Sequence, residues 1–419
     1  MVKLLFVNDS WQEIFHTLQK NKLRSFLTGF GVFWGILILM VLLGVGRGLE
    51  KAVLKQYKGR ATNSLWMFPG ATSIGFEGLP AGRTITVYQE HVEEMHQVVQ
   101  GIDLAVARNN LSGNYLVSRK NHFGRYTVFG TTDDYFEIDL QEVTRGRKLN
   151  PKDEEGSRKV ATIGQRVASL FFEPEEEPLG QYILINGVSF RVVGIYDDGG
   201  DVNAGYEVVW IPFQTFQEVF NHSKTVDIMA VTAQPGVPAS EVEAGVRKFF
   251  SRRLRYESGD EEALFIFNKE EEYKRWMGFF AGFRFFLWIV GIGTLTAGTV
   301  GVSNIMIVVV NDRKREIGIR KSIGATPWMI IRQILLESLV LTLAAGYAGI
   351  VLGTVILELV TYAMENFEID FGFFDTPEIH LSVVFTATLV LVLAGTLSAL
   401  IPARKAAQIR PVEALTSRT

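Results

Sequence analysis

The sequence of 419 residues contains no cysteine. This absence excludes disulfide bonds, thiolate metal sites and a thiol nucleophile. Histidine is scarce too, and the six histidines are scattered: His91 and His96 do not have the i, i+4 spacing of a metal-binding pair on a helix. No arrangement of serine, aspartate and histidine suggests hydrolysis. We therefore expect no catalytic, cofactor-binding or metal site on this chain, which by itself is not an enzyme.

A phosphate-binding loop is also missing, because the pattern G-x-x-x-x-G-K-[ST] occurs nowhere in the sequence. Glycines concentrate instead inside apolar runs, where small residues permit close packing of helices. The pair Gly349 and Gly353 has the small-x-x-x-small spacing of such a packing face. We expect helix packing, rather than ligand binding, from Gly291, Gly293, Gly298, Gly301, Gly346, Gly349 and Gly353.

Charged residues are absent from four long apolar runs. At a rise of about 1.5 Å per residue, about 20 residues cross a hydrocarbon core of roughly 30 Å. A signal peptide is a poor alternative for the first run, because a cleaved leader has a shorter apolar core and a small-residue cleavage site. We predict membrane helices at 25–46, 285–310, 333–357 and 381–403, around the uncharged runs Ser25–Gly46, Phe285–Val310, Ser338–Leu357 and Leu381–Ala403.

Lysine and arginine are distributed unevenly over the segments between these helices. Four lie in residues 1–24, six in 311–337 and four in 404–419, whereas 358–380 has none and carries six acidic residues. An excess of basic residues marks the cytoplasmic side of a membrane protein. The counts predict that both termini and the loop after the second helix are cytoplasmic. The large segment 47–284 and the short loop 358–380 are then extracytoplasmic.

The extracytoplasmic segment mixes strand and helix patterns and predicts an α+β domain. Asn186-Gly187, between two strand patterns, is a strong hairpin signal. Helix-forming residues at Gly48–Lys58 and Asn268–Arg284 predict that the first two membrane helices continue beyond the membrane as stalks. Without disulfides the domain has to fold by core burial alone, which its size permits. The pattern leaves open whether it forms one subdomain or two.

The N-terminal segment, residues 1–24, has the pattern of an amphipathic helix. Ser10 and Glu13 have capping-box spacing, and the apolar residues that follow recur at helical intervals before a basic cluster. Such a helix lies on the cytoplasmic surface of the membrane or packs on a partner protein, and the sequence favours neither.

The cytoplasmic loop 311–332 is short, strongly charged and bounded by glycine, and it carries Ile317, Ile319 and Ile323. A simple connection would not need isoleucines among alternating charges. We expect a short helix that lies along the membrane and inserts into a groove of a partner through charge-assisted pairs. A basic loop that only sets the topology is the alternative.

The third membrane helix has a clear start, with Thr326 as N-cap and Pro327 in the first helical position. Glu337 lies shortly after this start. Glu337 is either a functional charge within the membrane or, one turn past Arg332, a residue at the membrane–water interface. We prefer the position at the membrane–water interface.

The residues of this loop, with those around it, resemble the permease core of the MacB-like, FtsX-type branch of ABC transporters. The resemblance covers nearly the whole chain at matching positions. It is carried by Lys22–Thr28 with Gly31, Leu179–Ile183, Phe190–Ile195, Val302–Met306, Arg313–Thr326, Leu336–Ser338, Ile401–Ala407 and Arg410–Leu415.

The resemblance implies a mechanotransmission (type VII) transporter of the bacterial inner membrane. Its permeases form a homodimer, or a heterodimer with a related permease, above two ABC ATPases that bind ATP and Mg²⁺. ATP-driven movement then passes through the stalks to the extracytoplasmic domains. By position, Glu316, Gly318, Ile319, Arg320 and Gly324 form the helix that couples to the ATPase; Arg313, Arg315 and Lys321 belong to a basic stretch of the same loop.

One departure from the family pattern concerns the ATPase. The protein that gives the branch its name carries its ATPase ahead of the first membrane helix, where this sequence has 24 residues. The resemblance therefore implies a separate ATPase subunit, and in some members also a periplasmic adaptor and an outer-membrane channel. Nothing in the sequence implies a nucleic-acid partner.

Three functions agree with this family. Efflux or export of drugs, peptides or toxins is the leading hypothesis. Extraction of lipoproteins from the membrane fits the same topology, although the extraction permeases resemble the coupling loop less. Regulation of a cell-wall hydrolase in division is the third, and the large extracytoplasmic domain argues against it. The sequence does not name the substrate.

Overall fold

The computed structural model describes residues 22–55, 57, 61–111, 116–139, 142–196, 208–220, 224–367, 374–377 and 381–410. The predicted N-terminal amphipathic helix therefore lies almost entirely outside the described residues. The chain divides into two compact units, one made of Met1–Gln56 with Phe279–Thr419 and the other of Tyr57–Gly278. We describe each unit by itself.

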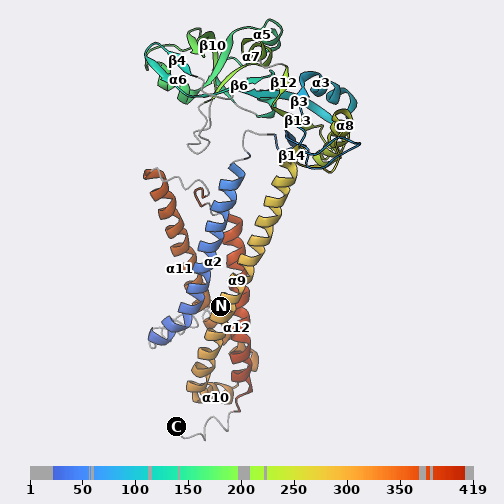
Figure 1. Ribbon diagram of the computed structural model, residues 1–419. Helices are drawn as coiled ribbons and strands as arrows, with labels where there is room; N and C mark the ends of the chain where they lie inside the picture. Colours follow the sequence, from blue (N-terminus) through green and yellow to red (C-terminus); the bar gives the residue numbers. More distant parts are fainter. Residues whose placement is uncertain are drawn as a thin grey trace. The chain divides into compact units, whose positions relative to one another are not determined.

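The first unit is helical (Figure 1). Within the described residues, four helices are long and apolar enough to cross a membrane, which confirms the predicted number of spans. Two of them extend well past their uncharged runs, since α2 continues to Lys55 and α9 begins at Lys269. The helices of this unit are α2 (Lys22–Lys55), α9 (Lys269–Asp312), α10 (Lys314–Ser322), α11 (Pro327–Asn366) and α12 (Leu381–Gln408).

Five of the seven glycines that were predicted to serve helix packing meet a neighbouring helix. A Cβ atom on Gly349 of α11 would lie 2.7 Å from the carbonyl oxygen of Phe33 on α2. A Cβ atom on Gly298 of α9 would lie 2.8 Å from the backbone of Gly31. Only glycine permits backbones to approach so closely. Gly291, Gly346 and Gly353 likewise meet neighbouring helices, whereas Gly293 and Gly301 have open space beside them.

The second unit is built on one 12-stranded sheet with the order β14-β1-β13-β3-β6-β11-β8-β10-β9-β4-β5, in which β7 also pairs with β10. Its strands are β1 (Ser64–Pro69), β3 (Ile102–Asn110), β4 (Val117–Arg119), β5 (His122–Gly124), β6 (Thr127–Thr131), β7 (Val143–Gly146), β8 (Val160–Gly164), β9 (Tyr182–Ile185), β10 (Val188–Tyr196), β11 (Val208–Pro212), β13 (Ile228–Ala233) and β14 (Leu264–Asn268). A separate pair joins β2 (Val87–Tyr88) to β12 (Thr225–Val226). The helices are α3 (Gln89–Val98), α4 (Tyr135–Ile138), α5 (Pro151–Glu155), α6 (Gln165–Phe171), α7 (Phe213–Phe220) and α8 (Ala239–Leu254).

The sheet carries separate hydrophobic cores along its length. Residues of α3 and α8, such as Met95 and Phe250, pack on β1, β13 and β14. Residues of α6 and α7, such as Val167 and Phe216, pack on β8 to β11. The two cores lie on one continuous sheet through β6 and β11. The segment Tyr57–Gly278 therefore forms one compact unit and does not divide into two subdomains. The predicted hairpin is confirmed, because β9 and β10 are joined by Asn186 and Gly187 with φ of 48° and 81°.

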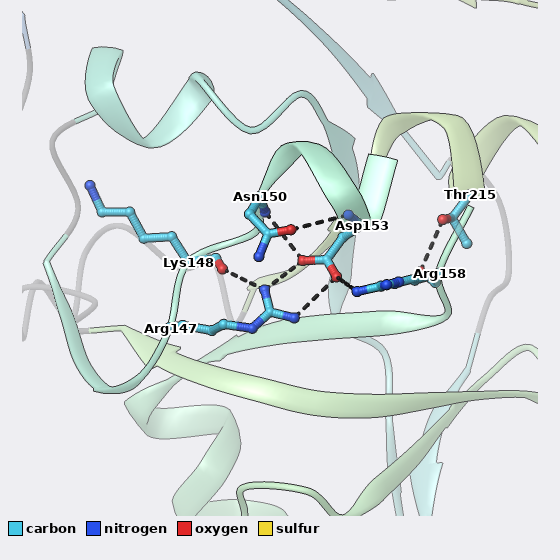
Figure 2. A network of polar contacts seen from close by, with 6 residues as sticks. All are labelled: Arg147, Lys148, Asn150, Asp153, Arg158 and Thr215. Atoms are coloured by element: carbon cyan, nitrogen blue, oxygen red, sulfur yellow. Dashed lines mark hydrogen bonds and ion pairs between the residues drawn. The ribbon is translucent and has the colours of Figure 1, made fainter. Parts of the chain in front are cut away.

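A buried carboxylate organises the segment between β7 and β8 (Figure 2). Asp153 of α5 is fully buried, and Nη2 of Arg147 donates to its Oδ1 at 3.0 Å. The guanidinium of Arg158 lies 3.6 Å from the same oxygen. Asn150 caps α5 by accepting a hydrogen bond from the backbone of Asp153. Because a buried charge is tolerated only when it is paired, these contacts fix this part of the fold.

Candidate functional site

The predicted coupling loop is folded as a short helix, α10, with tight turns on both sides. Arg313, with φ of −95° and ψ of 11°, separates it from α9. At the other end, Gly324 adopts a left-handed φ of +102°, and the N–H of Ala325 donates to the carbonyl of Arg320 at 3.0 Å. Glycine favours this conformation and ends helices in this way. Thr326 then caps α11 by accepting from the N–H of Met329, as predicted.

One side of α10 is buried against its own helical unit. Ile317 and Gly318 are buried, and Ile317 belongs to the same core as Met306, Ile330 and Ile334. The cavity left between α9, α10 and α11 is about 30 Å³. A space of that size holds a water molecule rather than a substrate. This end of the protein is therefore a packed joint and not a ligand pocket.

Arg313 connects the start of the coupling segment to α11. Its Nη1 lies 3.4 Å from Oε2 of Glu337, whose exposed fraction is only 7%. The side chain of Glu337 is thus turned into the helical unit and away from solvent. Whether it lies within the membrane or at the membrane–water interface stays a prediction. Burial of an unpaired carboxylate is costly, so this pair holds Arg313 and Glu337 together.

Arg320 and Lys321 make the next connections. Arg320 donates through Nη2 to Oε1 of Glu316 at 2.6 Å and through Nη1 to Oε1 of Gln333 on α11 at 2.9 Å. The ammonium of Lys321 donates to two carbonyls at the end of α12, those of Ala407 and Ile409, the second at 2.8 Å. A cation suits the carbonyl end of a helix, which carries partial negative charge. Together these contacts attach α10 to both following membrane helices.

The other side of the segment is exposed. Arg315, Ile319 and Ile323 are spaced four residues apart, so they lie on one side of α10. Ile323 is 81% exposed, and Trp328, in the first turn of α11, is 67% exposed. We call the exposed residues Arg315, Ile319, Ile323, Trp328 and Met329 the coupling face.

The eight residues singled out from the sequence therefore divide into two groups. Arg313, Gly318, Arg320 and Lys321 face their own unit, and Glu316 is exposed but paired with Arg320. Arg315, Ile319 and Gly324 remain exposed. Sequence reasoning missed Trp328 and Met329. Two large apolar residues directly after the cap and proline of a helix were the available signal.

A second set of polar contacts holds the last turns of α2. Lys51 donates to Oγ1 of Thr376 at 3.0 Å, and the N–H of Asp375 donates to the carbonyl of Gly48 at 3.1 Å. A Cβ atom on Gly48 would lie 2.7 Å from the carbonyl oxygen of Asp375. Burial would raise the pKa of Asp375, but hydrogen bonds from Thr376 and the nearby Lys51 and Lys55 keep it below its usual value. The loop between α11 and α12 is thus fastened to α2.

Four long apolar helices with a mixed sheet domain between the first and the second define a multi-pass membrane protein with a large domain outside the membrane. Two family models match the chain: the MacB-like periplasmic core domain over residues 25–249 and the FtsX-like permease C-terminal domain over residues 288–411. The chain belongs to the family of MacB-like, FtsX-type permeases. This confirms the resemblance seen in the sequence and makes it a multi-pass protein of the bacterial inner membrane.

Curated relatives match nearly all of this chain. It is 27% identical over 410 residues to the probable syringafactin export ATP-binding/permease protein SyfD of Pseudomonas syringae, covering 95% of this chain and 58% of the relative. It is 29% identical to the pyoverdine export ATP-binding/permease protein PvdT of Pseudomonas putida, covering 98% and 60%. For the macrolide export ATP-binding/permease protein MacB of Escherichia coli the identity is 26%, covering 97% and 60%. The chain thus spans about three fifths of the length of these relatives.

Two solved structures match about half of this chain. The periplasmic region of MacB from Actinobacillus actinomycetemcomitans has 18% identity and a TM-score of 0.44, over 53% of this chain and 96% of that chain. The extracellular domain of the transporter YknZ from Gram-positive bacteria has 16% identity and a TM-score of 0.41, over 49% and 100%. The assignment to the family rests on the two family models.

Proposed function

We propose that this chain is the permease of an ABC exporter and that it transmits the movement of an ATPase across the membrane to its extracytoplasmic domain. The observation that carries the proposal is how α10 and the residues directly after it are exposed on one side and held on the other. It presents apolar side chains outward, at Ile319, Ile323 and Trp328, while Arg320 and Lys321 attach it to α11 and α12. The names of the curated relatives, which are export ATP-binding/permease proteins, support the same function.

A short helix that is tied at several points moves as one body with the helices that hold it. A force on the coupling face would therefore displace α11 and α12 instead of bending a loop. Lys51, Thr376 and Asp375 then join the loop after α11 to the end of α2. The movement has a continuous path of packed helices and polar contacts on which to travel.

The orientation is part of the proposal. The basic residues before α2, around α10 and after α12 favour a cytoplasmic position for both termini and for the coupling face. The domain of residues 57–278 then lies outside the cytoplasm. Because the chain has no cysteine, single cysteines placed at Ile323 and at Tyr182 would report their side by labelling with a membrane-impermeant maleimide in intact cells. We expect labelling at Tyr182 and none at Ile323.

The ATPase, on this proposal, is a separate subunit that binds ATP and Mg²⁺ and docks on the coupling face of each permease of a dimer. The exposed Arg315 on the coupling face favours an acidic residue at the rim of the apolar groove of the ATPase. Efflux or export is the activity that the names of the relatives support best. The substrate is not identified by these observations.

Changing Ile323 and Trp328 to aspartate tests the docking site. The chain is purified under gentle detergent with its ATPase, and both recovery and ATP hydrolysis are measured. We expect at least a tenfold loss of bound ATPase, because even a single apolar residue at the centre of an interface can contribute about 2 kcal/mol. Phe123→Asp, which changes an equally exposed apolar residue of the outer domain, is the matched control. Unchanged recovery of the ATPase with the double variant would place the contact elsewhere.

A further inference from the structure

The outer domain contains a groove between α3 and α8. Its volume is about 950 Å³, which is within the range of small-molecule sites. The two helices are antiparallel here. Arg253, near the end of α8, pairs with Glu94 of α3 at 3.0 Å, while Gly245, nearer the start of α8, faces Val99 at the end of α3.

Part of the lining of the groove is apolar, and we call this part the floor. It is formed mainly by Val98, Val99, Val237 and Phe249. Gly245 makes this floor continuous, because a Cβ atom there would lie 2.8 Å from Cγ1 of Val99 and would push the helices apart. Val98 is 62% exposed, so the floor is open to a ligand from solvent.

The rim on the α8 side is basic. Lys248 and Arg252 are one helical turn apart, are exposed and line the groove. Within the described residues neither has an acidic partner, whereas the neighbouring Arg253 is neutralised by Glu94. Two cations without an acidic partner therefore line the groove, together with one further acidic residue, Glu241, and the basic residues outnumber the acidic ones.

One ion pair bridges the two walls of the groove. Arg253 pairs with Glu94 close to Phe249 and Arg252. A short ligand with its charged group beside Arg252 would extend its chain toward Gly101 and Val237.

We propose that the groove between α3 and α8 binds a single-chain amphipathic anion. Its carboxylate would accept charge-assisted hydrogen bonds from Lys248 and Arg252, and its alkyl chain would lie on Val98 and Phe249. The ligand enters from water and is not a lipid of the bilayer. The site goes beyond the proposed transmission of movement and binds without nucleotide, so the failure of either proposal leaves the other standing.

The test uses the full chain in nanodiscs of zwitterionic lipid, without ATP. A decanoate that carries a photoreactive diazirine on its chain is the probe, and labelled peptides are mapped by mass spectrometry. We expect labels in Val98–Gly101 and Gly245–Arg252, with competition by plain decanoate. The Lys248→Glu/Arg252→Glu variant should lower this labelling about tenfold, because both charge-assisted contacts are lost.

Two matched variants complete the design. Lys152→Glu/Lys159→Glu makes the same change of charge outside the groove and should leave labelling intact. Val98→Asp, at an exposed position, places an anion on the floor and should also reduce labelling. Equal labelling by a trimethylammonium analogue of the probe would overturn the proposal, as would competition by anionic phospholipid vesicles instead of decanoate. Labelling that the double variant leaves unchanged would overturn it too.

Discussion

Arg313 and Glu337 face each other across the joint between α9 and α11, with 3.4 Å between Nη1 and Oε2. The carboxylate is almost fully buried, while the guanidinium is partly exposed. The pair therefore fixes Arg313, directly before α10, to Glu337, the eleventh residue of α11. Its role is structural and local, and it determines how firmly α10 is held.

Removing one member of this pair should cost more than removing both. Arg313→Leu removes the guanidinium that lies beside the buried carboxylate of Glu337, and we expect a loss of about 1–3 kcal/mol in stability. Arg313→Leu/Glu337→Leu should recover most of that loss, because the buried carboxylate is removed together with the guanidinium. Thermal unfolding of the purified chain, measured for both single variants and the double variant, completes the cycle. Additive losses would mean that the two side chains do not interact.

A variant at Lys321 can distinguish attachment of the ATPase from transmission of its movement. Lys321→Met keeps the length of the side chain but removes the hydrogen bonds to the carbonyls of Ala407 and Ile409. The coupling face is left unchanged, so we expect normal recovery of the ATPase with at least a severalfold loss of substrate-stimulated ATP hydrolysis. A variant that loses the ATPase altogether would instead assign Lys321 to the docking surface. Lys321→Arg, which preserves the donors, serves as the control.

The helical unit offers a matched pair of glycines on one helix. Gly298→Ala should separate α9 from α2, because the new Cβ would lie 2.8 Å from backbone atoms of Gly31. Gly301→Ala, three residues later, meets nothing within 4 Å and should be neutral or slightly stabilising. We expect a difference of about 1–3 kcal/mol in unfolding between the two variants, since overpacking against a backbone cannot be relieved by a side-chain movement. Equal stabilities would show that α2 and α9 do not pack through these residues.

Much of this architecture could be predicted from local patterns. Four uncharged runs identify four membrane helices, because length and polarity alone decide whether a helix can span a bilayer. Thr326 and Pro327 mark the start of α11, and Asn186-Gly187 marks a hairpin, because caps and tight turns depend on the residues that form them.

Local patterns could not predict which side chains in and around α10 face their own helical unit and which face solvent. Nine residues with four basic side chains agree with several orientations of α10. The partners that choose among them are distant in sequence: Glu337 is 24 residues from Arg313, and Ala407 is 86 residues from Lys321. The order of strands is likewise set by contacts between distant segments, such as β1 with β13 and β14. Asp153 gave no sequence signal at all, since a buried acid and a surface acid look alike until their partners are placed.

The outer domain should respond to pH through Glu154. Burial raises the pKa of this carboxyl to about 7, although the N–H groups of Gln214 and Phe213 at the start of α7 oppose the rise. In the unfolded chain the pKa returns to near 4.5. Between these values the folded state binds the proton more tightly, so stability falls as pH rises from about 4.5 to 7 and stays low above it.

Glu154→Gln should remove this dependence. The amide oxygen can still accept from the N–H of Gln214, at 2.8 Å in the native chain, but it carries no charge to desolvate. We expect the variant to be more stable than the native chain by about 1–3 kcal/mol at pH 8 and nearly equal to it at pH 5. Unfolding of the outer domain, followed by tryptophan fluorescence at both pH values, measures the difference. A variant that is less stable than the native chain at pH 8 would mean that Glu154 is ionised in the fold and stabilises the start of α7 as a charged cap.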